Sequence, residues 1–253
     1  MRVRFSNLKL MAKSAKHYRC AVDAPRADST RAAKVGSAVH ALVLGQNLAH
    51  PIIRFNGDAR RGAAWTIFEK EANPNADILT TPEWEDAERI AESIKRDPVA
   101  RPRLHAPRYA TPLEWEEAGL LCVTSGVDII TTTGAIGDLK TTTSTEPDAW
   151  MRQAFQMHYP MQVAFYRRGA LACGIEVSKE LFLLGVETKP PYDVVDLTLT
   201  DAMIEHTERT LTLWLGKLKV CIESNQWPGY AQSSMMFDVP AWLGGGGDEE
   251  EDA

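Results

Sequence analysis

Two apolar runs joined by a short turn constrain the fold of this chain more than any other feature. The first run ends in Gly126-Val-Asp-Ile-Ile130, and the second is Gly134-Ala-Ile-Gly-Asp-Leu-Lys140. The turn-like residues between them predict that the runs pair as neighbouring strands. Side chains at positions i and i+2 of a strand lie on the same face of a sheet. Asp138 and Lys140 are therefore expected to share a face, and pairing brings Asp128 to that face as well.

Two carboxylates and one ammonium on a shared face suit a site that holds a divalent cation and hydrolyses a phosphodiester. Mg²⁺ is bound through few carboxylates, keeps several waters and takes phosphate oxygens as further ligands. It lowers the pKa of water and neutralises developing charge, while a lysine orients that water or contacts the phosphate. A solvated charge pair on an exposed strand is the structural alternative. The small, apolar residues before Asp138 favour a buried strand instead.

Two flanking segments carry further polar side chains on predicted helices. Upstream, residues 36–45 have the pattern of an apolar helix that carries one histidine, His40. Downstream, residues 149–166 have the pattern of a long helix, in which Gln162 and Tyr166 lie four residues apart and so on one face. Taken alone, a lone helical histidine and a Gln/Tyr pair are more often structural than functional. Their order along the chain changes that balance.

The ordered motifs resemble the RecB-type branch of the PD-(D/E)xK nucleases, and within it the RecE-like exodeoxyribonucleases of phages and prophages. The residues that carry the resemblance are Gly36-x-x-x-His40, Gly126-x-Asp128, Asp138-x-Lys140 and Gln162-x-x-x-Tyr166. The opening, from Ser6-Asn-Leu-Lys to His-Tyr18, is also similar to the opening of this family. The likeness covers roughly residues 5–243, and four ordered motifs are far more specific than any one of them.

The resemblance implies a role for each matching residue. Asp128 and Asp138 would bind metal, Lys140 would be the catalytic lysine, and His40 would be a further ligand or a close neighbour. The implied cofactor is Mg²⁺, with Mn²⁺ as a substitute. The remaining roles are a backbone carbonyl ligand from Leu139, and contact with the DNA backbone or bracing of the site by Gln162 and Tyr166.

One position departs from the family pattern. Relatives carry a glutamate on the strand before the Gly-x-Asp motif, about where Ala110-Thr-Pro112 stands here. Glu114 follows four residues later, on the same strand face by period-two counting, and is the candidate substitute metal ligand. An ordinary exposed residue before Trp115 is the equal alternative. The proline of the motif name is replaced by Val127, which matters less because that proline is not a ligand.

The fold that residues and resemblance together predict is α/β. It is a restriction-endonuclease-like sandwich, with a small mixed central sheet flanked by helices and a helical N-terminal region. Residues 1–243 are expected to form one nuclease domain, mainly helical over 1–100 and with the catalytic core at 105–225. The Gly-rich, acidic residues 244–253 are expected to be disordered. Helices are predicted near 6–17, 31–45, 62–72, 82–96, 147–172 with a kink at Pro160, and 200–223, and strands near 109–115, 119–130, 134–140 and 181–187.

The net charge of −6 has to be located before it is interpreted. Five of the 34 acidic residues lie in the tail, which leaves 28 basic against 29 acidic residues elsewhere. Residues 1–35 hold nine Lys/Arg against two Asp, a local balance of +7. A second small cluster, proposed to contact DNA, is Arg54, Arg60 and Arg61. Phosphate contacts dominate nucleic-acid affinity, so a basic N-terminal face suits DNA, and a solvated helix surface is the alternative.

Cysteine usage and hydropathy indicate the expected cellular compartment. The four cysteines are scattered without a Cys-x-x-Cys pair, which argues for free thiols and against an iron–sulfur cluster. No run approaches the ~18–20 apolar residues of a membrane span, and the N-terminus lacks a secretory apolar segment. The expected location is the cytoplasm of a bacterial host, with no membrane partner. The resemblance adds a single-strand annealing protein and a homo-oligomer as expected partners.

The leading interpretation is a Mg²⁺-dependent 5′→3′ exonuclease that acts on double-stranded DNA in phage-type recombination. Phosphodiester hydrolysis follows from the residues, whereas polarity and biological role come only from the resemblance. Two alternatives stay open. The first is an endonuclease or single-strand nuclease of the same superfamily. The second is a catalytically weakened recombination accessory that binds DNA ends.

Overall fold

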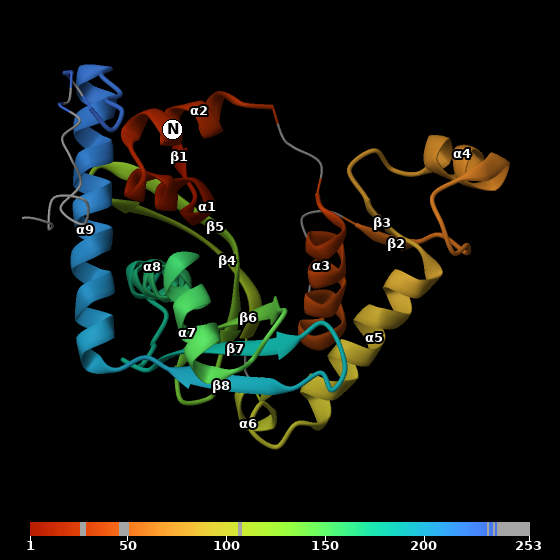
Figure 1. Cartoon of the computed structure of the whole chain (residues 1–253). Helices are drawn as coiled ribbons and strands as arrows, with labels where there is room; N and C mark the ends of the chain where they lie inside the picture. Colours follow the sequence, from red (N-terminus) through yellow and green to blue (C-terminus); the bar gives the residue numbers. More distant parts are fainter. Residues whose placement is uncertain (26–28, 46–50, 106–107, 232, 235, 237–253) are drawn as a thin grey trace, which may run out of the picture.

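A mixed sheet flanked by helices forms the centre of the computed structural model, which describes residues 1–25, 29–45, 51–105, 108–231, 233–234 and 236 (Figure 1). Within these residues the main sheet has six strands in the order β1-β5-β6-β7-β8, with β4 paired to β5. The β1–β5 and β6–β7 pairs are parallel, and the other three are antiparallel. The predicted α/β fold with a mixed sheet is thereby confirmed. The strands are β1 Arg2–Val3, β4 Arg108–Glu117, β5 Leu120–Ile130, β6 Ile136–Thr142, β7 Leu181–Glu187 and β8 Val194–Thr198.

Helices cover both faces of the sheet, because alternate strand residues feed two apolar cores. Ile136 and Leu183 pack with the N-terminal helices, α8 and α9, whereas Leu139 and Phe182 pack with α3 and α5 on the opposite face. In Figure 1, α3 and α5 lie to the right of the sheet and α9 to its left. The helices are α1 Phe5–Leu8, the 3-10 helix η1 Lys9–Ala12, α2 Ala15–Asp23, α3 Arg31–Leu44, α5 Thr81–Arg96, α6 Arg101–Leu104, α7 Pro147–Gln156, α8 Tyr159–Ala172 and α9 Asp201–Ser224.

The sheet forks between β5 and β6, and this fork positions the site. β5 and β6 pair only at Ile129–Gly137 and Ile130–Ile136. Beyond that point β6 pairs with β7 along its whole length, while β5 takes β1 as its neighbour instead. β4 already occupies the other edge of β5, so β1 and β6 share one edge and leave a gap between them. Polar side chains at the start of this gap are held by strands yet remain open to a pocket.

A two-stranded parallel sheet and a helix form an arm beside α3 and α5. The arm consists of β2 Ile52–Arg54, α4 Gly62–Glu71 and β3 Asp77–Leu79, and it projects at the right of Figure 1. α4 has no buried residue. The arm is tied to the body by Glu83, whose side chain also completes the capping box with Thr80 at the start of α5.

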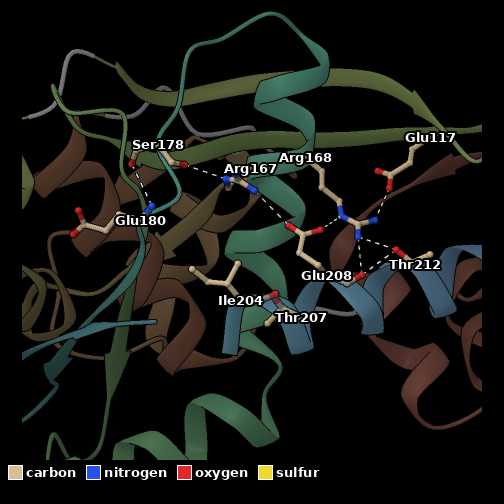
Figure 2. Close-up of polar contacts among 9 residues, drawn as sticks. All are labelled: Glu117, Arg167, Arg168, Ser178, Glu180, Ile204, Thr207, Glu208 and Thr212. Carbon is tan, nitrogen blue, oxygen red and sulfur yellow. Dashed lines mark hydrogen bonds and ion pairs between the residues drawn. The ribbon is translucent and has the colours of Figure 1, made fainter. Parts of the chain in front are cut away.

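Two cationic side chains of α8 tie that helix to α9 and to β4. Arg168 donates to the carboxylate and the backbone carbonyl of Glu208, to Thr212 and to Glu117, as Figure 2 shows. The neighbouring Arg167 donates to the carbonyl of Ser178 at 3.0 Å. The guanidinium of Arg168 therefore holds the C-terminal helix against the sheet.

Two predicted helices are wrong in detail. Residues 6–17 form three short pieces, because the Ser14 side chain accepts from the backbone of His17 and starts α2 anew. The predicted 147–172 helix is broken rather than kinked. His158 adopts a left-handed conformation with φ 62°, and Pro160 lies in the first turn of α8. The predicted disordered tail, 244–253, lies outside the described residues. No helix among the described residues is long and apolar enough to cross a membrane.

Candidate active site

Asp128 and Asp138 lie side by side where the fork opens. They occupy the next position in the register that pairs Ile129 with Gly137, and opposed residues of antiparallel strands point to the same face. The two residues are 8% and 1% exposed. The backbone N–H of Leu139 donates to Asp128 Oδ2 at 3.1 Å. Asp138 Oδ1 accepts no hydrogen bond from the described residues, which leaves a buried carboxylate oxygen without a donor.

Lys140 shares the face of Asp138, as the strand alternation predicts. Its ammonium lies 2.5 Å from Asp138 Oδ2 and 4.9 Å from the ring centroid of Tyr159. Burial alone would lower the pKa of Lys140, but Asp138 and Asp128 outweigh it and raise that pKa. Burial raises the pKa of Asp138, and nearby Asp128 raises it further against the opposing effect of Lys140. The three groups thus form one tightly coupled cluster.

α3 brings His40 to the cluster by an unusually close approach to β6. A Cβ on Gly36 would lie 3.2 Å from Thr141 Oγ1, so the Gly-x-x-x-His motif places the small residue where helix and strand touch. His40 Nδ1 lies 3.5 Å from Asp128 Oδ2. Burial lowers the pKa of His40 in spite of the carboxylate of Asp128. A neutral imidazole beside a carboxylate suits either a metal ligand or a bracing group.

α8 contributes Gln162 and Tyr166, which bond to each other. Gln162 Nε2 donates to Tyr166 Oη at 2.6 Å. Burial raises the pKa of Tyr166, and the negative charges of Asp138 and Asp128 raise it further, so the phenol faces the carboxylate cluster. The predicted pair therefore lies at the site, on one helix face, as the four-residue spacing requires.

A pocket of about 520 Å³ opens above the cluster. His40, Lys140, Gln162 and Tyr166 line it, whereas the two aspartates lie beneath its wall. The pocket also contains groups that sequence reasoning did not place there. They include Arg4, Lys9 and Tyr159. The basic N-terminal segment and its Ser-x-Leu-Lys motif were the only signals for the first two, and nothing in the sequence marked Tyr159.

Glu114 is not among the residues that line this pocket. It borders a smaller neighbouring hollow of about 220 Å³. Its carboxylate lies 3.3 Å from Arg2 Nη2 and is about half exposed. The structure therefore brings Glu114 to an arginine rather than to the carboxylate pair, which favours the exposed-residue alternative.

The predicted DNA-contact cluster lies on the arm, away from the pocket wall. Arg60 is committed elsewhere, since its guanidinium donates to both carboxylate oxygens of Glu83, at 2.8 and 2.6 Å, and to the Ile78 carbonyl. Arg60 is thus a cationic partner for the buried Glu83, and its contact with DNA stays a prediction. Arg54 and Arg61 are exposed and do not line the pocket.

The cluster fits a divalent cation with few protein ligands. Within the described residues, no three His, Cys, Asp or Glu side chains converge as a ready-made metal cage. Two adjacent carboxylates and the unbonded Asp138 Oδ1 nevertheless match the donor set that Mg²⁺ uses when waters and phosphate oxygens complete its shell. Asp128 and Asp138 are the residues that would hold such an ion.

Comparison with known proteins identifies the family and supports the fold. Residues 4–238 match the model of a family described as a PDDEXK-like domain of unknown function, DUF3799. A solved structure described as "Putative exonuclease" from Eubacterium rectale has a TM-score of 0.62 at 15% identity, over 94% of this chain and 89% of that chain. A phage related exonuclease from Haemophilus somnus 129PT has a TM-score of 0.38 at 13% identity, over 89% of this chain and 97% of that chain. A search of curated proteins finds no match. The first of these structures shares the fold.

Proposed function

The chain belongs to the DUF3799 family of PDDEXK-like domains, and from this premise we propose that it is a metal-dependent deoxyribonuclease. The single observation that carries the proposal is the convergence of Asp128, Asp138 and Lys140 on one sheet face beneath a pocket. Burying two carboxylates side by side destabilises a fold unless a cation is shared between them. A divalent ion bound there would neutralise charge on the phosphate and activate water for attack.

Lys140 has two roles in this proposal. Its ammonium lies 2.5 Å from Asp138 Oδ2 and neutralises that carboxylate. If the carboxylates held a cation, the ammonium would be free to contact the scissile phosphate as a point charge. Neutral His40 lies beside Asp128, and the Leu139 backbone bonds to His40. His40 and the Leu139 carbonyl would complete the proposed ligand set. Gln162 and Tyr166 direct an amide and a phenol at the sugar-phosphate backbone.

The finer substrate assignment rests on the resemblance and on the descriptions of the similar structures. Both of these structures are described as exonucleases, one of them as phage related. We propose double-stranded DNA as the substrate, 5′→3′ polarity and a role in recombination beside a single-strand annealing protein. We also propose that residues 1–243 act as one nuclease domain, an extent that the family match at 4–238 supports.

A DNA-end-binding accessory with weakened catalysis is the second candidate. It is favoured by the position of Glu114, which pairs with Arg2 outside the main pocket and leaves two carboxylates for the metal. Such a protein binds duplex ends with steep salt dependence yet cuts nothing with Mg²⁺ or Mn²⁺.

Cleavage of end-labelled linear and closed circular duplex DNA tests the proposal. The wild-type protein with Mg²⁺ is expected to release nucleotides from the linear form only. Asp138→Asn and Lys140→Ala should each reduce the rate by at least about 100-fold, whereas Glu114→Gln, outside the pocket, should stay near wild type. Equal release by all four proteins would reject the assignment. Cutting of the circle would replace exonuclease by endonuclease, and binding without cutting would favour the accessory.

A further inference from the structure

Lys9 is a half-buried cation without a partner. It is the first residue of η1 and lines the pocket above the carboxylate cluster. Its ammonium makes no ion pair or hydrogen bond with any described residue, whereas three other cations discussed above each pair with a carboxylate. Lys140 has Asp138, Arg2 has Glu114, and Arg60 has Glu83. Buried or half-buried charges are normally paired, so an unpaired Lys9 requires a reason outside the folded chain.

The surroundings of Lys9 are positively charged. Burial lowers the pKa of Lys9, and the charges of Lys140 and Lys13 lower it further. Across the same region, burial and the charge of Lys9 lower the pKa of His158. Of the described residues that line the pocket, Arg4, Lys9 and Lys140 are cationic, and none is Asp or Glu. The fold thus holds several cations around one hollow, an arrangement that destabilises the empty chain and is relieved by an anion.

The side chains that line the pocket favour phosphate as the anion. Lysine and arginine present N–H donors and positive charge, the combination that recognises phosphate oxygens. The scissile phosphate is assigned to the metal ligands and Lys140, on the β6 wall of the pocket. Lys9 and Arg4 enter from the N-terminal segment that follows β1, on the other branch of the fork. A phosphate bound there would be one next to the scissile phosphate, on the opposite wall of the pocket.

We propose that Lys9, assisted by Arg4, forms a phosphate subsite that binds a second phosphate of the DNA strand beside the one being hydrolysed. The subsite rests on the proposed nuclease function. Its phosphate is either an internal phosphodiester or a terminal phosphate at the strand end, which share the same charge-assisted contacts. The subsite fixes the register of the strand in the pocket and gives the Ser6-x-Leu-Lys9 motif a role in substrate binding.

The test compares Lys9→Gln with Lys9→Arg and with Lys13→Gln, a charge-matched control at the exposed residue that follows the same 3-10 helix. DNA affinity is measured with chelator present, by fluorescence anisotropy of a short duplex over a salt series. Lys9→Gln should weaken binding and reduce the slope of log K against log salt by about one. Lys9→Arg should restore both quantities, while Lys13→Gln should leave affinity close to wild type. Equal affinity and slope for Lys9→Gln and Lys13→Gln would overturn the subsite.

Two further measurements identify which phosphate is bound. They also distinguish a failure of the subsite from a failure of the nuclease proposal. The first compares duplexes that end in a 5′-phosphate or a 5′-hydroxyl. If Lys9→Gln weakens binding of the 5′-phosphate duplex alone, the subsite binds a terminal phosphate. If it weakens binding of both duplexes, the subsite binds an internal phosphate. Inorganic phosphate should raise the melting temperature of the wild type more than that of Lys9→Gln, without any DNA present. Because none of these readouts needs cleavage, an inactive wild type would reject the nuclease proposal alone. An active wild type with unchanged Lys9→Gln would reject the subsite alone.

Discussion

Lys140 is held from two sides, and only one of its partners is a carboxylate. Asp138 contacts the ammonium, and the face of the Tyr159 ring lies 4.9 Å from it. If a metal were bound by the carboxylate, the ring of Tyr159 would be the remaining contact of the ammonium. Tyr159 is therefore a positioning residue in this account, acting on the reaction through the lysine.

Two substitutions of Tyr159 distinguish the contribution of its ring from that of its hydroxyl. Tyr159→Phe keeps a ring beneath the ammonium and should retain activity within about threefold. Tyr159→Leu removes the cation–π contact, which is worth about 1–2 kcal/mol when desolvated, and should lower kcat by about tenfold. Steady-state nuclease kinetics measure the effect, with Mn²⁺ affinity as the control that should not change. Equal losses in the two variants would assign the role to the hydroxyl instead.

Site residues could be placed from the sequence where their relation lies within one strand or one helix. Asp138 and Lys140 were placed correctly by strand alternation, and Gln162 and Tyr166 by helix periodicity, because these relations lie within one element. Lys9 and Tyr159 could not be placed, since their position in the pocket depends on contacts between distant elements. Glu114 illustrates the reverse. Period-two counting gave it the right strand, but an irregularity in the β4–β5 register at residues 111–113 changes what lies opposite.

At the scale of elements, the approach of α3 to β6 depends on a glycine. A Cβ at Gly36 would meet Thr141 Oγ1 at 3.2 Å, whereas a Cβ at Gly216, inside α9, meets nothing within 4 Å. Gly→Ala inside a helix normally stabilises by about 0.5–1 kcal/mol. Gly216→Ala should show that gain and Gly36→Ala should not. Urea unfolding measures both, and Thr141→Ala in the Gly36→Ala background should restore the gain. Equal gains at both glycines would contradict a tight helix–strand contact.

The link between the arm and α5 is electrostatic and gives a pH dependence. Burial alone would raise the pKa of Glu83, but hydrogen bonds from Arg60 and the Thr80 backbone outweigh it and lower that pKa below 4.5. A carboxyl whose pKa is depressed by folding stabilises the folded state above its unfolded pKa, and this contribution is lost as pH falls through the folded pKa. The stability difference between wild type and Glu83→Gln should therefore be full at neutral pH and shrink below pH 4.5. Thermal unfolding over a pH series measures it, and a difference that grows in acid would contradict this ion pair.

The attachment of α9 depends on Arg168, which is 16% exposed and bonds Glu117 and Glu208. Arg168→Met should destabilise by about 3 kcal/mol, because it removes the cation that Glu117 and Glu208 share and leaves Glu208 only Arg167, at 3.7 Å. Arg209→Met is the matched control on α9, the helix that Arg168 contacts. Its pair with Glu205 is more than 60% exposed on both sides, so its loss should stay below about 0.5 kcal/mol. Chemical unfolding of both variants gives the comparison, and equal losses would show that the network is not a structural anchor.

Long elements were predicted well and short ones were not. The strands at 120–130, 136–142 and 181–187 and the helix at 81–96 carry strong periodicity or a capping box. β1 has two residues, and β2 and β3 have three each, which is too short for any periodic signal. The fork between β5 and β6 was also out of reach, because it is set by which strand pairs with β5 beyond Ile129.

For the whole molecule, net charge was a poor guide to the binding surface. The chain is acidic overall, at −6, yet the described walls of the pocket carry cations and no carboxylate. The fold accomplishes this by burying Asp128 and Asp138 beneath the wall and bringing the basic N-terminal segment over it. The homo-oligomer stays a prediction.

One measurement tests the central claim that Asp128 and Asp138 share a divalent cation. Crystals grown with Mn²⁺ would be measured for anomalous scattering at the manganese edge. The account predicts a peak about 2.2 Å from a carboxylate oxygen of each aspartate, present in the wild type and absent from Asp138→Asn. Saturating Mn²⁺ with no peak between the two carboxylates, or a peak that persists unchanged in Asp138→Asn, would contradict it.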